Sequence, residues 1–295
     1  NNCGQTNWET AEKILQLRAD RLCLKKAHAT EKQVSLVLAG DLQAQCTASS
    51  YALRELHLPF MGLFGACSTM AEGLALGAAL CEGGAARNLL AMASSHFCAA
   101  ERQFRTPLSY GAVRTPTAQW TATAAGCCLL QPQGEGVGIA AATFGRVQDY
   151  QVKDINNMGA AMAPAAASTL LHYFKDTGTE PQEFDCIYTG DLGQVGSQLL
   201  RELLAAEGLL IKNHVDCGCI LFDANEQSVK SGGSGPGCCA AVLCGHILPR
   251  LRRGSQKRVL FTATGALMSQ TTFLQKETIP AVAHLVELRA PEKEK

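Results

Sequence analysis

The sequence lacks the features that mark a membrane-spanning, nucleic-acid-binding or secreted chain. Although 47% of its 295 residues are hydrophobic, no apolar run approaches the ~18 residues that a membrane span needs. The formal net charge is zero and Lys and Arg form no long run, which argues against nucleic acid as a partner. There is no secretory signal peptide and no initial Met, and we expect a segment upstream of Asn1 to have been removed.

The fourteen cysteines lack the repeating spacing of a disulfide scaffold. Several lie in apolar runs, so we interpret them as buried free thiols of a reducing compartment. A zinc site needs two ligand pairs at suitable spacing. Cys217-Gly-Cys219 and Cys238-Cys239 have no second pair of that kind, so no metal site is predicted.

The stretch 58–77 predicts a buried strand, a sharp turn at Gly65 and a helix. Ser68 and Thr69 can cap this helix. Cys67 then lies at the helix N-terminus, where free N–H groups and the helix dipole favour a thiolate. The alternative interpretation is a buried cysteine that serves as a small core hydrophobe.

Hydrophobic patterns predict further elements along the chain. Helices are expected at 8–26, 47–56, 158–174, 195–206 and 238–251. Strands are expected at 35–40, 87–95, 118–130, 137–147, 185–189, 217–222, 257–263 and 284–289, with 118–130 and 137–147 paired across a turn at 132–134. The segment 95–116 has no period and carries many charges, which is typical of a functional loop, and a solvated excursion is the alternative.

Two parts of the chain repeat one plan. The Gly-Asp-Leu that ends the strand near Gly40 returns at Gly190, an offset of 190 − 40 = 150. The strand 87–95 returns at 257–265, an offset of 257 − 87 = 170, which places the Cys67 turn opposite Gly237.

Strands that alternate with helices imply parallel sheets covered by helices. We therefore predict an α/β fold with two pseudo-repeated halves, 1–147 with Cys67 and 148–295. The small-residue helices that follow Cys67 and Gly237 should pack against each other. This arrangement gives five layers, α/β/α/β/α.

This plan resembles the thiolase-like fold, and Cys67 matches the acyl-accepting cysteine of its condensing enzymes. A specific set of motifs covers nearly the whole chain: AGDL (39–42), PF-x-x-x-FGACST (59–69), SSH (94–96), AERQFR (100–105), MG-x-AMAPAAA (158–167), TGDL-x-x-VGS (189–197), HVDCG (214–218), GGSG (232–235), ATGAL-x-S (263–269) and QKETIP-x-x-AH (275–284). With these motifs the chain resembles the stage V sporulation protein AD family of spore-forming bacteria. Family members carry a first strand before the helix 8–26, so we expect that strand to be missing here.

Acyl condensation needs a thiolate, a proton-handling pair such as two histidines or His and Asn, and donors for the oxyanion. The resemblance puts Gly190 where the type III ketoacyl synthases carry histidine, and Pro236 where they carry asparagine. Neither residue has a side chain that can transfer a proton. His214, His246 and His284 do not match the family base, and we interpret them as surface or core histidines.

The resemblance implies non-catalytic binding of dipicolinic acid (pyridine-2,6-dicarboxylate) in support of its uptake into the developing spore during sporulation. The alternative is a thiolase-type acyltransferase or condensing enzyme with Cys67 as acyl acceptor. A flat dianion needs fixed cations, N–H groups and a dry slot. The expected ligand-binding residues are Cys67, Ser68, Thr69, His96, Arg102, Arg105, Gly190, Asp191, Gly233, Ser234, Thr264 and Gly265. Arg102 or Arg105, with His96, should face the Cys67 cleft, unless they hold the loop by pairing with Glu101 or Asp149.

Partners and location are also implied by the resemblance. We expect a homodimer formed through the edge of the first sheet, and membrane proteins of the same sporulation transport system as partners. The expected location is intracellular in the sporulating cell, peripheral at the inner spore membrane, with no transmembrane segment. No cofactor is expected, and whether calcium accompanies dipicolinate stays open.

Overall fold

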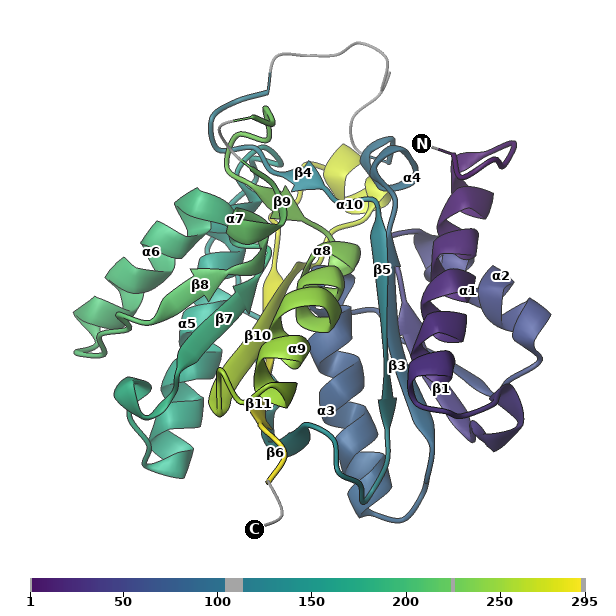
Figure 1. The fold of residues 1–295 in the computed structure, drawn as a ribbon. Coiled ribbons are helices and arrows are strands. Elements are labelled where there is room, and N and C mark those ends of the chain that lie inside the picture. The colour runs from purple at the N-terminus through teal and green to yellow at the C-terminus, as the bar shows by residue number, and fades with distance from the viewer. Residues whose placement is uncertain (1, 104–113, 224–225, 293–295) are drawn as a thin grey trace.

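The computed structural model describes residues 2–103, 114–223 and 226–292, which form two large sheets, one two-stranded sheet and three layers of helices (Figure 1). The helices are α1 (Trp8–Lys26), α2 (Thr47–Leu56), α3 (Thr69–Glu82), α4 (Phe97–Glu101), α5 (Met158–Thr177), α6 (Gly193–Ala206), α7 (Cys217–Leu221), α8 (Pro236–Val242), α9 (Leu248–Arg252) and α10 (Gln270–Leu274). The strands are β1 (Leu36–Gly40), β2 (Phe60–Gly62), β3 (Leu89–Ser95), β4 (Trp120–Thr121), β5 (Ala124–Leu130), β6 (Gly138–Thr143), β7 (Cys186–Gly190), β8 (His214–Asp216), β9 (Gly233–Ser234), β10 (Arg258–Ala266) and β11 (Ala281–Arg289).

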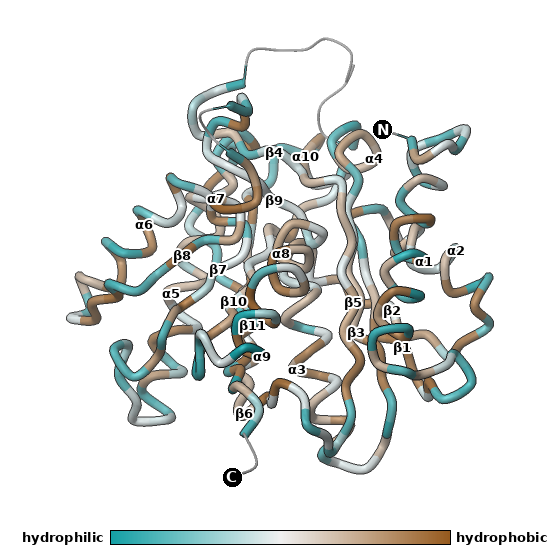
Figure 2. Tube along the Cα trace, viewed as in Figure 1, coloured by the Kyte–Doolittle hydropathy of each residue, from teal (hydrophilic) through white to brown (hydrophobic). Residues whose placement is uncertain are grey.

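The five predicted layers are confirmed. The first sheet has the order β2-β1-β3-β5 and the second the order β6-β11-β10-β7-β8. Helices α1 and α2 cover the outer face of the first sheet, α5 and α6 cover that of the second, and α3 and α8 lie between the sheets (Figure 1). Apolar residues follow β3 and β5, whereas polar residues gather toward the loops (Figure 2). The two sheets therefore share one apolar middle layer.

The repeat is visible in the strand register. Gly40 on β1 pairs with Ala93 on β3, and Gly190 on β7 pairs with Ala263 on β10. These pairs follow from the sequence offsets, since 40 + 150 = 190 and 93 + 170 = 263. Helices α3 and α8 contact each other as predicted.

Both sheets are mixed rather than parallel throughout. The predicted pairing of 118–130 with 137–147 is wrong, because β5 pairs antiparallel with β3 while β6 pairs antiparallel with β11 in the other sheet. A turn signal shows where the chain reverses, but it does not show which neighbour each strand meets. The chain thus changes sheets between β5 and β6, and a division into halves at 147 stays a prediction.

The prediction of a buried strand over 58–64 is also wrong. Only β2 is extended there, and it forms the edge of the first sheet. Met61 is 46% exposed and Phe64 is 67% exposed. An apolar run generally indicates a buried strand. On an edge strand, however, no further strand covers the apolar side chains, and they stay exposed unless another surface packs against them.

The predicted strand at 217–222 is instead the short helix α7, preceded by β8. Asp216 caps this helix, since its Oδ1 accepts a hydrogen bond from the Gly218 N–H at 2.9 Å. The N-cap bond satisfies a donor of the first turn and outweighs the strand preference of the apolar residues. In the described residues of the segment 95–116, the short helix α4 follows β3.

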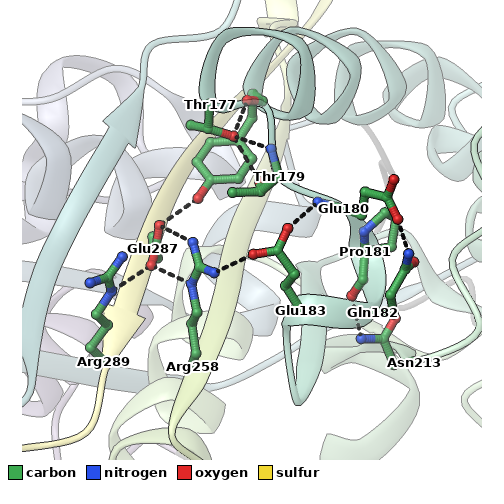
Figure 3. Close-up of polar contacts among 11 residues, drawn as sticks. Thr177, Thr179, Glu180, Pro181, Gln182, Glu183, Asn213, Arg258, Glu287 and Arg289 are labelled. Atoms are coloured by element: carbon green, nitrogen blue, oxygen red, sulfur yellow. Dashed lines mark hydrogen bonds and ion pairs between the residues drawn. The ribbon is translucent and has the colours of Figure 1, made fainter.

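A buried polar cluster joins α5 to β10 and β11 (Figure 3). Glu287 on β11 accepts hydrogen bonds from the Tyr173 hydroxyl at 2.5 Å and from the Nε atoms of Arg258 and Arg289, both at 2.7 Å. Burial opposes ionisation of Glu287, but these donors outweigh it and lower its pKa to about 2. The carboxylate therefore fastens the outer helix layer to the second sheet.

Candidate functional site

Cys67 lies in a single 3-10 turn, Ala66–Ser68, that leads directly into α3. Its side chain is 8% exposed. The Ser68 hydroxyl donates to the Gly65 carbonyl and the Thr69 hydroxyl donates to the Ala66 carbonyl, each at 2.7 Å. Both hydroxyls thus bond back to the turn, and the prediction that they cap α3 is wrong.

Residues of the second half close around the Cys67 turn. A Cβ atom on Gly265, at the end of β10, would stand 2.1 Å from the Gly65 carbonyl oxygen. The Cys239 thiol of α8 donates to the Cys67 carbonyl with an Sγ–O distance of 3.5 Å. The main-chain N–H groups of Cys67 and Gly235 approach the Cys67 sulfur. The site is therefore built at the junction of the two halves.

The thiol of Cys67 is not poised as a thiolate. Burial raises the pKa of Cys67 well above its ordinary value, and the nearby Asp191 acts in the same direction. The N–H groups of Gly235 and Cys67 lower this pKa by less. The expectation that the helix N-terminus makes this thiol ionise easily is wrong, because desolvation of the charged form dominates.

Asp191 is a fully buried acid in the left-handed backbone region, with φ +70°. Burial, with the charge of Asp216, raises its pKa well above the ordinary value, against long contacts from the thiols of Cys238 and Cys239. Neither carboxyl oxygen has a hydrogen-bond partner within the described residues. A neutral Asp191 retains an O–H that can donate to an anionic ligand.

Asp216 organises the loop that carries Asp191. Its carboxylate accepts hydrogen bonds from the Thr189 hydroxyl at 2.7 Å, the Leu192 N–H at 3.0 Å and the Gly193 N–H at 2.9 Å. Burial nevertheless raises its pKa to about 6. Sequence reasoning missed this role, although the HVDCG motif contains the residue.

Gln119 is a second residue that sequence reasoning missed. Its Nε2 donates to the carbonyl oxygens of Asp191 and Gly233, while its buried Oε1 has no partner within the described residues. Gln119 thereby bridges two of the glycine turns that surround the site. An isolated Gln in a loop gives no sequence signal for such a position.

Ser95 ties the end of β3 to the start of α8. Its hydroxyl accepts from the Gly237 N–H at 3.2 Å and donates to the Ala122 carbonyl at 2.7 Å. A Cβ atom on Gly237 would stand 2.7 Å from the Ser95 Oγ. The GGSG-Pro-Gly turn therefore needs its glycines for close packing.

The structure directs Arg102 toward α1 rather than toward Cys67. Its guanidinium pairs with Glu9 and lies 5.5 Å from the centre of the Trp8 ring. The alternative prediction paired this arginine with Glu101 or Asp149. In the structure Glu101 pairs with Arg114 at 3.0 Å, and Asp149 accepts a hydrogen bond from the Thr278 hydroxyl. Arg105 lies outside the described residues. His96 is buried and is the N-cap residue of α4.

The other predicted site residues occupy neighbouring turns. The Thr264 hydroxyl donates to the carbonyl of Gly190, at the ends of β10 and β7. Gly233 and Ser234 form β9, which pairs with β4. The structure thus brings Cys67, Ser68, Asp191 and Gly265 together, and it links Gly233 to them through Gln119.

The three histidines have partners of their own. His214 Nε2 lies 2.8 Å from the Thr189 hydroxyl and His284 Nδ1 accepts from the Gly145 N–H at 3.2 Å. Burial lowers the pKa of each to about 4. His246 packs edge-on against Tyr188, with ring centres 6.2 Å apart. These contacts agree with their interpretation as structural histidines.

Two cavities lie outside the Cys67 site. One of about 290 Å³ is lined by residues that include Lys153, Met268 and Lys276. The other, of about 390 Å³, is lined by residues that include His214 and Arg250. In the parts of the chain that the structure describes, no three His, Cys, Asp or Glu side chains are grouped to hold a metal ion. No helix among the described ranges is long and apolar enough to cross a bilayer.

Comparison with protein families decides the identity of the chain. The family model described as Stage V sporulation protein AD matches residues 1–289. The chain belongs to the stage V sporulation protein AD family. It is 43% identical over 284 residues to Stage V sporulation protein AD of Bacillus subtilis (strain 168), covering 96% of this chain and 84% of that protein. This family member is therefore a sporulation protein.

Solved structures show that the family has the fold of the thiolase-like condensing enzymes. The 3-oxoacyl-[acyl-carrier-protein] synthase III of Aquifex aeolicus VF5 matches with a TM-score of 0.60 at 12% identity, covering 94% of this chain and 84% of that one. OleA of Xanthomonas campestris matches with a TM-score of 0.63 at 14% identity, covering 94% of this chain and 80% of that one. At such identities the likeness concerns the fold alone.

Proposed function

We propose that this protein binds dipicolinic acid beside Cys67 without chemical turnover, and so supports uptake of dipicolinic acid into the developing spore. The proposal rests on the observation that Cys67, at the position of the nucleophile in condensing enzymes, has neither a lowered pKa nor the proton-handling side chains of those enzymes. Cys67 is buried with a raised pKa, and the resemblance puts Gly190 and Pro236 where the type III ketoacyl synthases carry proton-handling side chains. A site without these groups keeps its shape for binding but has no base to activate the thiol.

The donors around Cys67 suit a flat dianion. The N–H groups of Cys67 and Gly235 approach the sulfur, and the start of α3 adds the positive end of its dipole. The raised pKa of Asp191 favours its protonated form, which carries an O–H donor in place of a charge that would repel the ligand. Arg102 is paired with Glu9, so the proposal places recognition on these donors, with Arg105 as the candidate cation.

Calorimetry with dipicolinate tests the proposal, with picolinate as the matched ligand that lacks one carboxylate. Each charge-assisted contact contributes ~1.5–3 kcal/mol, so picolinate should bind roughly ten- to a hundredfold more weakly. Incubation with acetyl-CoA followed by mass spectrometry tests the alternative function, a thiolase-type acyltransferase. An acetyl group on Cys67 that turns over would show an acyltransferase and overturn the proposal.

We also propose a homodimer joined through β2. This strand forms the free edge of the first sheet, and Met61 and Phe64 expose apolar side chains beside it. Two edges that pair would cover these side chains and satisfy the open backbone groups. Sedimentation should give twice the monomer mass for the wild type and a monomer for Met61→Asp. Val147→Asp, a change of a comparably exposed residue, is the control and should stay dimeric.

The proposed location is the surface of the inner spore membrane, held by membrane proteins of the same transport system. No helix among the described residues is long and apolar enough to cross a bilayer, and the proposal rests on the family resemblance. Fractionation of sporulating cells should find the protein with membranes only while those partners are present. Recovery with membranes in a strain that lacks them would contradict this location.

A further inference from the structure

Two thiols meet where β5 passes the central helix layer. Cys128 Sγ on β5 lies 3.8 Å from Cys244 Sγ. Cys244 belongs to the π-helical turn Leu243–Ile247 that joins α8 to α9. Both residues are free cysteines at the margin of the core, each partly exposed as a residue. Neither residue belongs to the group around Cys67.

Close packing of the backbone places the two thiols together. A Cβ atom on Gly126 would stand 2.6 Å from the Ala240 carbonyl oxygen, so β5 and α8 touch at this point. Two residues along a strand and four along a helix both advance the chain by about 6–7 Å. Cys128 is two residues beyond Gly126 on β5, and Cys244 is four residues beyond Ala240 on the helix. The strand and the helix therefore meet again at these two cysteines. The geometry belongs to the core of the fold rather than to a surface loop.

The two sulfurs differ in their tendency to ionise. The hydrogen bond between the two thiols, in which either sulfur can donate, lowers the pKa of Cys244, and the charges of Lys26 and Arg252 act in the same direction against burial. The same hydrogen bond, with burial, raises the pKa of Cys128 well above its ordinary value. We assign the attack to Cys244, whose thiolate the charges of Lys26 and Arg252 favour, and the resolving step to Cys128.

We propose that Cys128 and Cys244 form an oxidative modification site that a small hydroperoxide closes to a disulfide. The Cys244 thiolate attacks one oxygen of hydrogen peroxide, the O–O bond breaks, and a sulfenic acid and hydroxide form. Cys128 then gives its proton to the hydroxide and its sulfur attacks the Cys244 sulfur. The S–O bond breaks, and its oxygen leaves as water after protonation. Two thiols and one peroxide thus give one disulfide and two waters.

The bond would fasten β5 of the first sheet to the central helices of the second half. It closes a loop between residues 116 positions apart, and long loops lose the most conformational freedom in the unfolded chain. The oxidised protein should therefore melt at a higher temperature than the reduced one. Dithiothreitol should reverse the shift, because a disulfide is the reducible product of this chemistry.

Hydrogen peroxide treatment of the full chain tests the proposal. The thiol count of the denatured protein should fall from fourteen to twelve, 14 − 2 = 12. Peptide mapping under non-reducing conditions should find Cys128 linked to Cys244. A link between other cysteines, or an unchanged thiol count, would overturn the proposal.

Three serine variants assign the two roles. Cys244→Ser should keep all its remaining thiols under mild peroxide, whereas Cys128→Ser should accumulate a sulfenic acid on Cys244 that dimedone traps. Cys23→Ser is the matched control, because Cys23 hydrogen-bonds to the neighbouring Cys127. It should still form the Cys128–Cys244 bond, and its failure to do so would contradict the assignment.

Discussion

Gly265 lies so close to Gly65 that a Cβ atom on Gly265 would stand 2.1 Å from the Gly65 carbonyl oxygen. At this contact the end of β10 packs directly against the turn that carries Cys67. The glycine at 265 is therefore needed for space, and it sets how closely the second half approaches the nucleophile position.

The first prediction follows from this contact. Gly265→Ala should lower the free energy of unfolding by ~1–3 kcal/mol, since the added methyl overpacks a backbone contact, and it should weaken dipicolinate binding. Urea unfolding measures the stability. Gly245→Ala is the control, because nothing lies within 4 Å of a Cβ there and Gly245 is helical. Equal effects of the two changes would contradict the close-packing account.

The second prediction compares two arginines of the segment that follows β3. Arg114 pairs with Glu101, which is 2% exposed. Arg114→Ala should cost ~3 kcal/mol, because it removes a cation that pairs with a buried carboxylate. Arg102→Ala should cost at most ~1 kcal/mol, since that pair is solvent-accessible, with the Arg102 side chain 46% exposed. The reverse order in thermal unfolding would count against this description of the loop.

The third prediction concerns acid stability. The pKa of Glu287 falls from 4.5 to about 2 in the folded protein. Its contribution to stability is thus fully present above pH 4.5 and is lost as the pH falls through about 2. Urea unfolding should show stability that declines between pH 5 and pH 2, and Glu287→Gln should flatten that part of the decline. Glu55→Gln, at a solvent-exposed carboxylate that pairs with Lys13, serves as the control and should change the slope much less than Glu287→Gln.

The fourth prediction concerns alkaline pH. Burial, with the charge of Asp41, raises the pKa of Glu12 from 4.5 to about 8. The folded state therefore holds a proton that the unfolded state releases above pH 4.5, and stability falls as the pH rises from 4.5 to 8. Glu12→Gln, which carries no titratable proton, should reduce that fall. A variant with the wild-type slope would show that Glu12 is ionised in the folded protein.

Much of the fold was predictable because its signals are local or repeated. The two Gly-Asp-Leu motifs and the two offsets predicted that the halves repeat one plan, and the equivalent pairs Gly40–Ala93 and Gly190–Ala263 confirm that repeat. Helices such as α1 begin and end at the predicted residues, since Asn7 caps α1 through a side-chain bond to the Thr10 N–H. Sheet partners of β5 and β6 were not predictable, because strand pairing depends on contacts between distant residues.

The site was predictable in part. The FGACST and ATGAL motifs pointed to Cys67 and Gly265, and the structure brings their two turns together, because glycine turns mark close approach of the backbone. The equivalent Asp41 and Asp191 show the limit of motif reasoning. Asp41 accepts from the Ser49 N–H and hydroxyl, at 2.9 and 2.7 Å, whereas the Asp191 oxygens have no such partner within the described residues. The partners of a buried acid come from other elements, and the sequence does not show them.

A crystal structure of the protein soaked with dipicolinate is the most direct test of the proposed function. We expect the pyridine ring beside Cys67 and Gly265, with one carboxylate at the N–H groups of Cys67 and Gly235 and no acyl group on the sulfur. A ring bound only in the cavity lined by Lys153 and Lys276, or no bound ring at concentrations that saturate the calorimetric signal, would contradict the account.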